Sequence, residues 1–346
     1  MKILIFNLST DTNDSALSFT VNWVNSISTS YKQVYLITLK GNLKGLNPNV
    51  VAYRLYTNKN KNKIIVLLKF YFFLVLVLSK KIDRCFCHMN PLFLSLTLGV
   101  LKLYNVKSIL WYTHPSITLK LKFATFLSDK VLTASKKSFP LTTTKLIPIG
   151  HAIETSLFES LDLKKKYISC VGRISRVKNI DVLIRSYAKL KSKGKKLLII
   201  GDTITREDKK FKNELVHLIN DLNLQNYIFL RQSVSRKNLV RIYNESFVHV
   251  NLTSEGFLDK VAIEAMACGT ISLSSNSGYK NIYGEFDKKL LFKYRDENDL
   301  LNKLNFILNL DNQNRNRIEK TLRKNVVNYH SIDTIGSRIE KIFNSI

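Results

Sequence analysis

Residues 167–188 read YISCVGRISRVKNIDVLIRSYA. The first five, YISCV, are apolar or small, as in a buried strand, and apolar residues then return at positions 180, 183, 184, 187 and 188. That spacing is typical of a helix with one core-facing side. The loop GRISRVKN, residues 172–179, joins the two. A strand, a short loop and a helix in this order predict one unit of a parallel α/β sheet.

The same alternation continues on both sides of this stretch. Longer helical patterns separate the strands, among them Leu17–Ile27, Pro91–Leu103, Lys237–Glu245 and Lys260–Cys268. We expect strands at Lys2–Leu8, Gln33–Leu39, Val50–Leu55, Arg84–His88, Ser108–Tyr112, Lys130–Ala134, Lys145–Ile149, Tyr167–Val171, Leu197–Ile200, Tyr227–Leu230, Phe247–Leu252 and Ile271–Ser274. We therefore predict an α/β fold with two doubly wound Rossmann-like domains facing a cleft.

The alternation of strand and helix patterns stops at residues 150–164, which show neither pattern. A chain of 346 residues also exceeds one ordinary domain. We place the N-terminal domain at residues 1–152 and the C-terminal domain at 153–328. A C-terminal helix at 329–346 is expected to return to the N-terminal domain.

The formal net charge is +28, and residues 1–150 hold 20 Lys and Arg against four acids, a net of +16. This excess favours an anionic partner such as a phospholipid surface, a lipid diphosphate or nucleic acid. The alternative explanation of the charge is a Lys-rich composition without any anionic partner. The four cysteines are sparse and lie in apolar or small-residue runs, which favours a reduced, cytoplasmic protein. No signal peptide is expected, and the apolar run Ile64–Leu78 is short of the ~20 residues that span a membrane.

Two segments carry residues suited to chemistry. In GRISRVKN, Gly172 permits close backbone approach while Arg173 and Lys178 supply cations, so the loop suits a diphosphate, or else is a solvated loop of a basic chain. The second segment, SEGFLDKVAIEAMACG, spans residues 254–269 and contains Glu264 inside an apolar helix. A buried carboxylate needs a partner, which sugar or ribose hydroxyls would provide.

These two segments, with LLIIGD at residues 197–202 between them, resemble the retaining family-4 glycosyltransferases of the GT-B fold. The resemblance is specific in residues 168–275 and looser in the N-terminal, acceptor-side domain. It implies that Arg173 and Lys178 hold the diphosphate of a nucleotide-sugar donor and that Glu264 holds its ribose. It also implies that the first Glu of the motif, with the amides of Gly256 and Phe257 after it, engages the donor sugar.

Two departures from the family pattern leave roles open. Glu255 and Glu264 are separated by eight residues where the family has seven, so either Glu255 or Asp259 could contact the donor sugar. Glu255 is the preferred candidate. Gly201-Asp202-Thr203 also replaces the commoner Gly-Asp-Gly, which leaves a phosphate role for that turn open.

His114 follows the expected strand Ser108–Tyr112 and matches a family position whose His contacts the donor sugar near the reacting carbon. The catalytic candidates are therefore His114 and Glu255. No Asp-x-Asp occurs, and no His, Cys or Asp cluster has metal-ligand spacing. We expect no metal site and no cofactor, the nucleotide-sugar being a co-substrate.

Taken together, these features predict a hexosyltransferase-type enzyme acting on a glycan or lipid-linked acceptor in cell-surface polysaccharide or glycolipid assembly. We expect it in the cytoplasm, peripheral on the inner face of the cell membrane and attracted to its anionic surface. The alternative is a non-catalytic polyanion- or nucleic-acid-binding protein, which the basic charge alone favours; nucleic acid is not the expected partner. A dinucleotide-dependent oxidoreductase is disfavoured because residues 7–12, after the first strand, contain no glycine.

Overall fold

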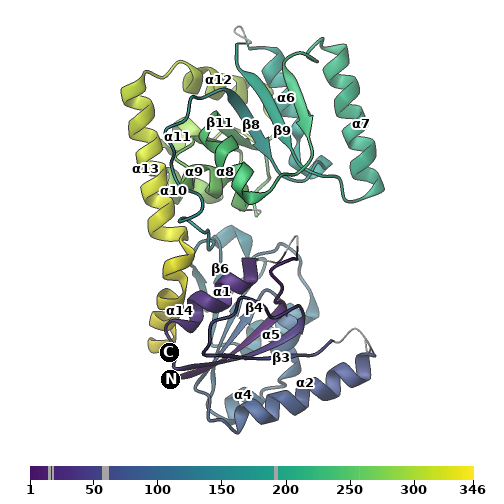
Figure 1. The fold of residues 1–346 in the computed structure, drawn as a ribbon, viewed down its shortest axis with the longest axis vertical. Coiled ribbons are helices and arrows are strands. Elements are labelled where there is room, and N and C mark those ends of the chain that lie inside the picture. The colour runs from purple at the N-terminus through teal and green to yellow at the C-terminus, as the bar shows by residue number, and fades with distance from the viewer. Residues whose placement is uncertain (15–16, 18, 57–61, 191–193, 257) are drawn as a thin grey trace. The chain divides into compact units, whose positions relative to one another are not determined.

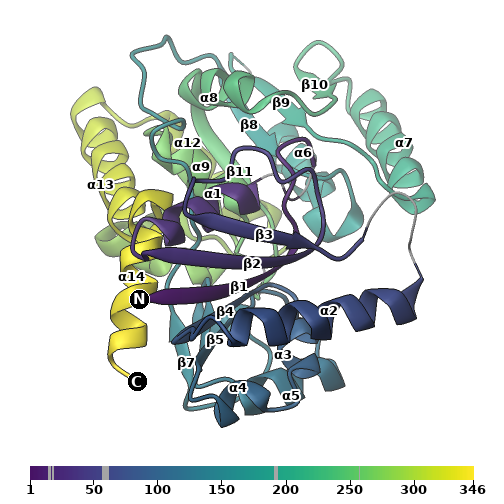
Figure 2. The same cartoon turned by 60° about the horizontal axis from the view of Figure 1, so that its bottom comes forward.

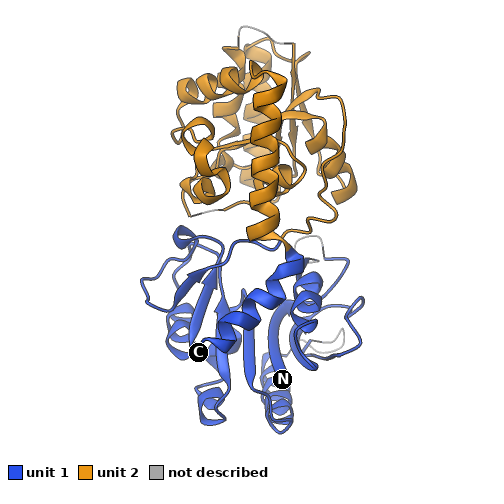
Figure 3. Ribbon diagram, turned by 90° about the vertical axis from the view of Figure 1, so that its left-hand side faces the viewer, with its two compact units in different colours: residues 1–152, 332–346 blue, residues 153–331 orange. Residues whose placement is uncertain are grey.

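The computed structural model describes residues 1–14, 17, 19–56, 62–190, 194–256 and 258–346. The chain forms two compact units (Figure 3). Unit 1 holds Met1–Ala152 together with Ile332–Ile346, and unit 2 holds Ile153–Ser331. The C-terminal tail thus joins unit 1 from Ile332, three residues after the start expected for the returning segment.

Unit 1 is built on a seven-stranded parallel sheet with the order β3-β2-β1-β4-β5-β6-β7 (Figure 1). Its strands are β1 (Lys2–Ser9), β2 (Gln33–Lys40), β3 (Val50–Arg54), β4 (Arg84–His88), β5 (Lys107–Trp111), β6 (Lys130–Thr133) and β7 (Leu146–Pro148). Each lies within one residue, at both ends, of a strand expected from the sequence. The short apolar runs located these strands correctly, because central parallel strands are buried on both faces and are therefore apolar throughout.

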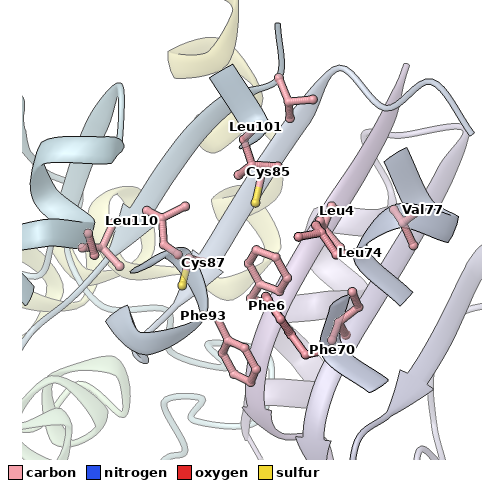
Figure 4. Close-up of a cluster of buried hydrophobic side chains, with 14 of the residues drawn as sticks. Leu4, Phe6, Phe70, Leu74, Val77, Cys85, Cys87, Phe93, Leu101 and Leu110 are labelled. Atoms are coloured by element: carbon pink, nitrogen blue, oxygen red, sulfur yellow. The ribbon is translucent and has the colours of Figure 1, made fainter. Parts of the chain in front are cut away.

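One face of this sheet is covered by four helices, α2 (Lys63–Leu78), α3 (Pro91–Leu96), α4 (Val100–Leu103) and α5 (Leu119–Leu127) (Figure 2). Their buried side chains form one hydrophobic cluster with alternate residues of the strands, such as Leu4 and Phe6 of β1 and Cys85 and Cys87 of β4 (Figure 4). The rings of Phe6 and Phe93 stack with centroids 5.5 Å apart. Burial raises the pKa of the Cys87 thiol to about 12, as expected for a structural cysteine.

The other face carries α1 (Phe19–Ser28) and the returning tail, α14 (Ile335–Asn344). Trp23 of α1 packs on Phe86, a β4 residue that alternates with the two buried cysteines. Gly336 lets the two helices approach closely, since a Cβ there would lie 2.0 Å from the carbonyl oxygen of Ser26. The tail is therefore part of the unit 1 core.

The expectation of one helix over Pro91–Leu103 is wrong. α3 ends at Leu96 and α4 begins at Val100, because Leu98 and Gly99 adopt positive φ angles of 49° and 84°. A left-handed pair of residues ends the α-helical hydrogen-bond ladder, and glycine makes one of the two positions easy to adopt. The apolar periodicity alone did not reveal this break.

Unit 2 is a five-stranded parallel sheet with the order β10-β9-β8-β11-β12. Its strands are β8 (Tyr167–Val171), β9 (Lys196–Ile200), β10 (Ile228–Arg231), β11 (Ser246–Asn251) and β12 (Ser272–Ser274). Its longer helices are α6 (Ile180–Ala188), α7 (Arg206–Asp221), α8 (Arg236–Asn244), α9 (Lys260–Ala267), α12 (Glu297–Leu308) and α13 (Asn312–His330). Ser235 caps α8, since its hydroxyl accepts a hydrogen bond from the N–H of Asn238. The prediction of an α/β fold with two Rossmann-like domains is thus confirmed.

Candidate functional site

The candidate site lies where the strand order of unit 2 reverses. β8 has β9 on one side and β11 on the other, so the connections after β8 and β11 diverge at this point. Open parallel sheets bind ligands beyond the carboxyl ends of their strands at such a position. There Gly172, Arg173, Lys178 and Asn251 contribute to the lining of a pocket above the ends of β8 and β11. The GRISRVKN loop therefore borders the position where this fold binds ligands.

Two glycines allow the backbone to close over the ends of β8 and β9. Gly172 adopts a φ of 147°, and a Cβ on Gly201 would lie 1.8 Å from the carbonyl oxygen of Gly172. The N–H of Gly172 donates to the carbonyl of Ile200, and the N–H of Gly201 donates to that of Arg231. No side chain fits between these segments, so the loop starts close to the sheet.

Arg173 is fixed by an acid from the first turn of α7. Its Nε and one terminal nitrogen lie 2.8 and 2.7 Å from Oδ2 of Asp208. Burial opposes the ionisation of Asp208, but N–H groups of Thr205 and Ile204, together with Arg173, outweigh it and lower its pKa to about 2. Asp208 also forms a reciprocal capping box with Thr205. The start of α7 thereby orients a half-exposed guanidinium at the pocket.

Lys178 is held by a second carboxylate. Its Nζ lies 2.5 Å from Oδ2 of Asp259, which also accepts a hydrogen bond of 3.0 Å from Nδ2 of Asn251. The Asn251 amide oxygen in turn accepts from the hydroxyl of Thr253 at 2.6 Å. The hydroxyl of Tyr279 donates to the backbone carbonyl of Asp259 at 2.9 Å. The ion pair therefore joins the loop after β8 to the residue before α9.

Asn179 secures the end of the loop. It adopts a left-handed φ of 47° and is buried. Its Nδ2 donates to the carbonyl of Leu252 at 3.0 Å, and its Oδ1 accepts from Nε of Arg295 at 2.8 Å. The amide thus ties the loop after β8 to the segment after β11, and α6 begins at the next residue.

Glu264 lies one turn inside α9, among charged neighbours. Burial raises its pKa, while the nearby cations Arg236 and Lys260 oppose that rise. Burial also lowers the pKa of Lys260 to about 8. Arg236 donates to Oε2 of Glu154 at 2.6 Å. Glu264 is therefore a partly buried carboxylate in a mixed-charge environment, and its contact with a ribose stays a prediction.

The loop before α9 carries the other predicted sugar contacts. Glu255 is exposed and accepts hydrogen bonds from the N–H and the hydroxyl of Ser277, at 2.9 and 3.0 Å. Gly256 has a φ of 89°, a conformation that favours glycine. Phe257 lies outside the described residues. Asp259 is thus paired with Lys178, whereas Glu255 is engaged by Ser277.

His114 belongs to unit 1, three residues after the end of β5. It is exposed, and its Nδ1 accepts a hydrogen bond from the N–H of Ser116 at 3.1 Å. That bond orients the ring. The structure thus brings Arg173, Lys178 and Asp259 together in unit 2, while the role of His114 stays a prediction.

The roles of three polar residues of this site were missed from the sequence: Asp208, Asn179 and Asn251. Thr205-x-x-Asp208 is a capping-box pattern that could have located the start of α7, but not the Arg173 partner of its acid. The two asparagines gave no signal, because an amide is recognised as structural only once its hydrogen bonds are seen. The described residues hold no group of three or more His, Cys, Asp or Glu suited to a metal ion.

Asp202 has a local role in the structure. Its carboxylate accepts hydrogen bonds from the N–H and the hydroxyl of Ser233, which lower its pKa. This contact ties the turn after β9 to the loop after β10. The Asp202 carboxylate is thus engaged by Ser233, and the phosphate role of the turn stays open.

Comparison with known proteins places this site in a wider context. The profile of the family described as "Glycosyl transferases group 1" matches residues 154–325. N-acetylgalactosamine-N,N'-diacetylbacillosaminyl-diphospho-undecaprenol 4-alpha-N-acetylgalactosaminyltransferase of Campylobacter jejuni is 32% identical over 155 residues, which are 44% of this chain and 40% of that protein. GDP-Man:Man(3)GlcNAc(2)-PP-Dol alpha-1,2-mannosyltransferase of Homo sapiens is 26% identical over 189 residues, which are 50% of this chain and 38% of that protein. The matches thus span about two fifths of these relatives.

Solved structures match the whole chain. A glycosyltransferase from Rickettsia africae superposes with a TM-score of 0.80 at 16% identity, covering 99% of this chain and 98% of the other. The Anabaena protein HepE in complex with UDP gives a TM-score of 0.76 at 15% identity, with both chains fully covered. At such identities the likeness shows the fold.

Proposed function

Residues 154–325 of this chain, which has the GT-B fold, belong to the group 1 glycosyl transferases, and on that premise we propose a specific activity. The protein transfers a sugar, with retention of its anomeric configuration and without a bound metal ion, from a nucleotide-sugar to a glycan or lipid-linked acceptor. The observation that carries this proposal is the pair of oriented cations, Arg173 and Lys178, at the switch point of unit 2.

In this proposal the two cations bind the donor diphosphate. A diphosphate is the leaving group of sugar transfer, and its negative charge grows as the bond to the sugar breaks. Fixed cations and helix-end N–H groups that face this charge stabilise the transition state, because their orientation is set before the reaction. Arg173 and Lys178 are held in place by Asp208 and Asp259, and α9 begins beside them. Electrostatic stabilisation of this kind needs no divalent ion.

We assign Asp259 to the positioning of Lys178 and Glu255 to the donor sugar. The Oδ2 atom of Asp259 already accepts from Lys178 and Asn251, whereas the exposed Glu255 carboxylate accepts from Ser277. A sugar hydroxyl can replace the hydrogen bonds of a serine in kind, whereas Lys178 and Asp259 form a short, partly buried ion pair. Gly256 and Phe257 would contribute N–H groups to the sugar, Glu264 would bind the ribose, and His114 would contact the sugar near the reacting carbon.

The acceptor is proposed from chemistry shared with the relatives. The Campylobacter protein is named for a diphospho-undecaprenol substrate, and the human protein for a PP-Dol substrate. A lipid-linked acceptor carries negative charge, which suits the excess of Lys and Arg in residues 1–150. With such an acceptor the enzyme would act at the inner face of the cell membrane, in polysaccharide or glycolipid assembly. The rival, a non-catalytic polyanion-binding protein, would use the same positive charge without a donor.

A thermal-shift screen with UDP-, GDP- and ADP-sugars, each in EDTA, tests the proposal. A donor present at 100 times its dissociation constant adds ~2.7 kcal/mol to the free energy of unfolding. We expect one nucleotide class to raise the melting temperature in EDTA. A shift with DNA or heparin but with none of the donors would favour the polyanion-binding rival.

A further inference from the structure

Helix α2 of unit 1 is apolar on its outward side as well as its inward side. Phe70, Leu74, Val77 and Leu78 are buried in the core. On the opposite side Ile64, Leu68, Phe72 and Val75 are between 65% and 70% exposed. Their spacing of four, four and three residues places them in one stripe along the helix. A helix that is apolar all round is stable only where both of its sides leave water.

The outward side of α5 has the same character. Phe123 and Phe126 are 41% and 68% exposed, while Leu121 and Ala124 of the same helix are buried. The Nζ of Lys102 in α4 lies 5.5 Å from the centre of the Phe126 ring, which links the neighbouring helix to this surface. Leu103, at the end of α4, is 82% exposed.

These outward sides face the same way. The buried sides of α2, α4 and α5 all enter the one hydrophobic cluster beneath them, so their exposed sides point away from the same sheet face (Figure 2). The helices are also joined through α3: the hydroxyl of Tyr71 donates to the carbonyl of Leu96, and that of Ser95 donates to the carbonyl of Lys120. We call the exposed outward residues of α2, α4 and α5 the outer helix surface. An exposed apolar patch of this kind marks an interaction site.

Charge indicates what covers the outer helix surface. The segment 63–126 contains nine Lys and Arg and one acid, Asp83. Among these cations Lys63, Lys80, Lys102, Lys120 and Lys122 are exposed. A second copy of the chain would set lysines against lysines across the contact. An anionic bilayer would instead receive the apolar stripes in its interface and the lysines at its headgroups.

We propose that the outer helix surface is a docking site for an anionic phospholipid bilayer, with α2 lying along the interface. The helix has 16 residues and therefore a length of about 24 Å, which is less than the ~30 Å hydrocarbon core. Among the described residues, none of the helices combines the length and the apolar character needed to cross a membrane. The docking site rests on the proposed function only for its purpose, which is to bring unit 1 to a lipid-linked acceptor.

Co-sedimentation with vesicles, without donor, tests this surface. The wild type is expected to pellet with phosphatidylcholine vesicles that contain phosphatidylglycerol, and less so as salt rises. The double variant Leu68→Ser/Phe72→Ser should bind these vesicles at least tenfold more weakly, because the apolar contacts are lost. Lys120→Gln/Lys122→Gln should lose about fivefold for each lysine, from ~1 kcal/mol each. Ile204→Ser, in unit 2 at a side chain 72% exposed, is the matched control and should bind like the wild type.

Equal binding of the wild type and Leu68→Ser/Phe72→Ser, or no pelleting at low salt, would overturn the proposal. The proposal would also be overturned if the wild type formed a dimer and Leu68→Ser/Phe72→Ser were a monomer, because the surface would then belong to a contact with a second copy. The thermal shift with a nucleotide-sugar, measured in lipid-free buffer, should be the same in wild type and variant. A lost donor shift with retained vesicle binding would refute the proposed function and leave the docking site standing.

Discussion

The Lys178 ammonium and the Asp259 carboxylate lie 2.5 Å apart and join two segments that are distant in the sequence. Lys178 belongs to the loop after β8, and Asp259 directly precedes α9. With Arg173 held by Asp208 in the same way, both proposed phosphate-binding cations have a carboxylate partner. Each cation is thereby oriented by its carboxylate partner.

Asp259→Asn and Glu255→Gln are expected to affect turnover differently. Asn can still accept a hydrogen bond from Lys178, so Asp259→Asn should keep turnover within a few-fold of the wild type. Glu255→Gln removes the charge proposed to hold the donor sugar, and should lower kcat roughly 10- to 100-fold, as for a lost charged hydrogen bond. Release of nucleoside diphosphate at saturating donor measures both. A larger loss in Asp259→Asn than in Glu255→Gln would reverse the two assignments.

Glu264→Gln is expected to weaken the binding of donor and of free nucleoside diphosphate alike, because the ribose is common to both. A lost hydrogen bond to a charged group predicts a rise in Kd of roughly 10- to 100-fold. Isothermal titration calorimetry provides the comparison. Glu285→Gln, an exposed acid that pairs with Arg317 in unit 2, is the control and should bind like the wild type. Unchanged affinity in Glu264→Gln would remove this residue from the site.

Asp208→Asn is expected to destabilise the protein in a pH-dependent way. The pKa of Asp208 falls from 3.8 to about 2 on folding, so its ionised form stabilises the folded state. The contribution is complete above about pH 4 and disappears as the pH falls towards 2. The melting-temperature difference between wild type and Asp208→Asn should therefore be constant near neutral pH and shrink between pH 4 and 2. A difference that grew on acidification would contradict the assigned partners of this carboxylate.

Gly201→Ala is expected to destabilise unit 2 and to weaken donor binding together. The added Cβ would lie 1.8 Å from the carbonyl oxygen of Gly172 and 3.5 Å from the nitrogen of Arg173, so the loop after β8 must move. Overpacking of this kind costs about 1–3 kcal/mol or more. Urea unfolding and donor titration of the variant measure the two effects. Wild-type stability in Gly201→Ala would show that the two segments are less closely packed than described.

The strands and the position of the GRISRVKN loop could be predicted from the sequence because their signals are local. Buried parallel strands are continuous apolar runs, and GRISRVKN directly follows one of them. The break between α3 and α4 could not be predicted, since it depends on left-handed φ angles at Leu98 and Gly99. The pairing of Lys178 with Asp259 was equally hidden, because they are 81 positions apart in the sequence and only the tertiary fold brings the loop after β8 and the start of α9 together. Among several acids near the motif, sequence spacing alone could not select the partner.

The affinity for the nucleotide-sugar in Arg173→Ala and Lys178→Ala, measured by calorimetry in EDTA, tests the central claim most directly. Arg176→Ala is the matched control, since this neighbouring cation of the same loop pairs with Glu214 and is 63% exposed at its side chain. Each lost charge-assisted phosphate contact is worth ~1.5–3 kcal/mol. The account predicts a roughly 10- to 100-fold rise in Kd for Arg173→Ala and Lys178→Ala, and wild-type affinity for Arg176→Ala. Equal affinity in all three variants and the wild type would contradict it.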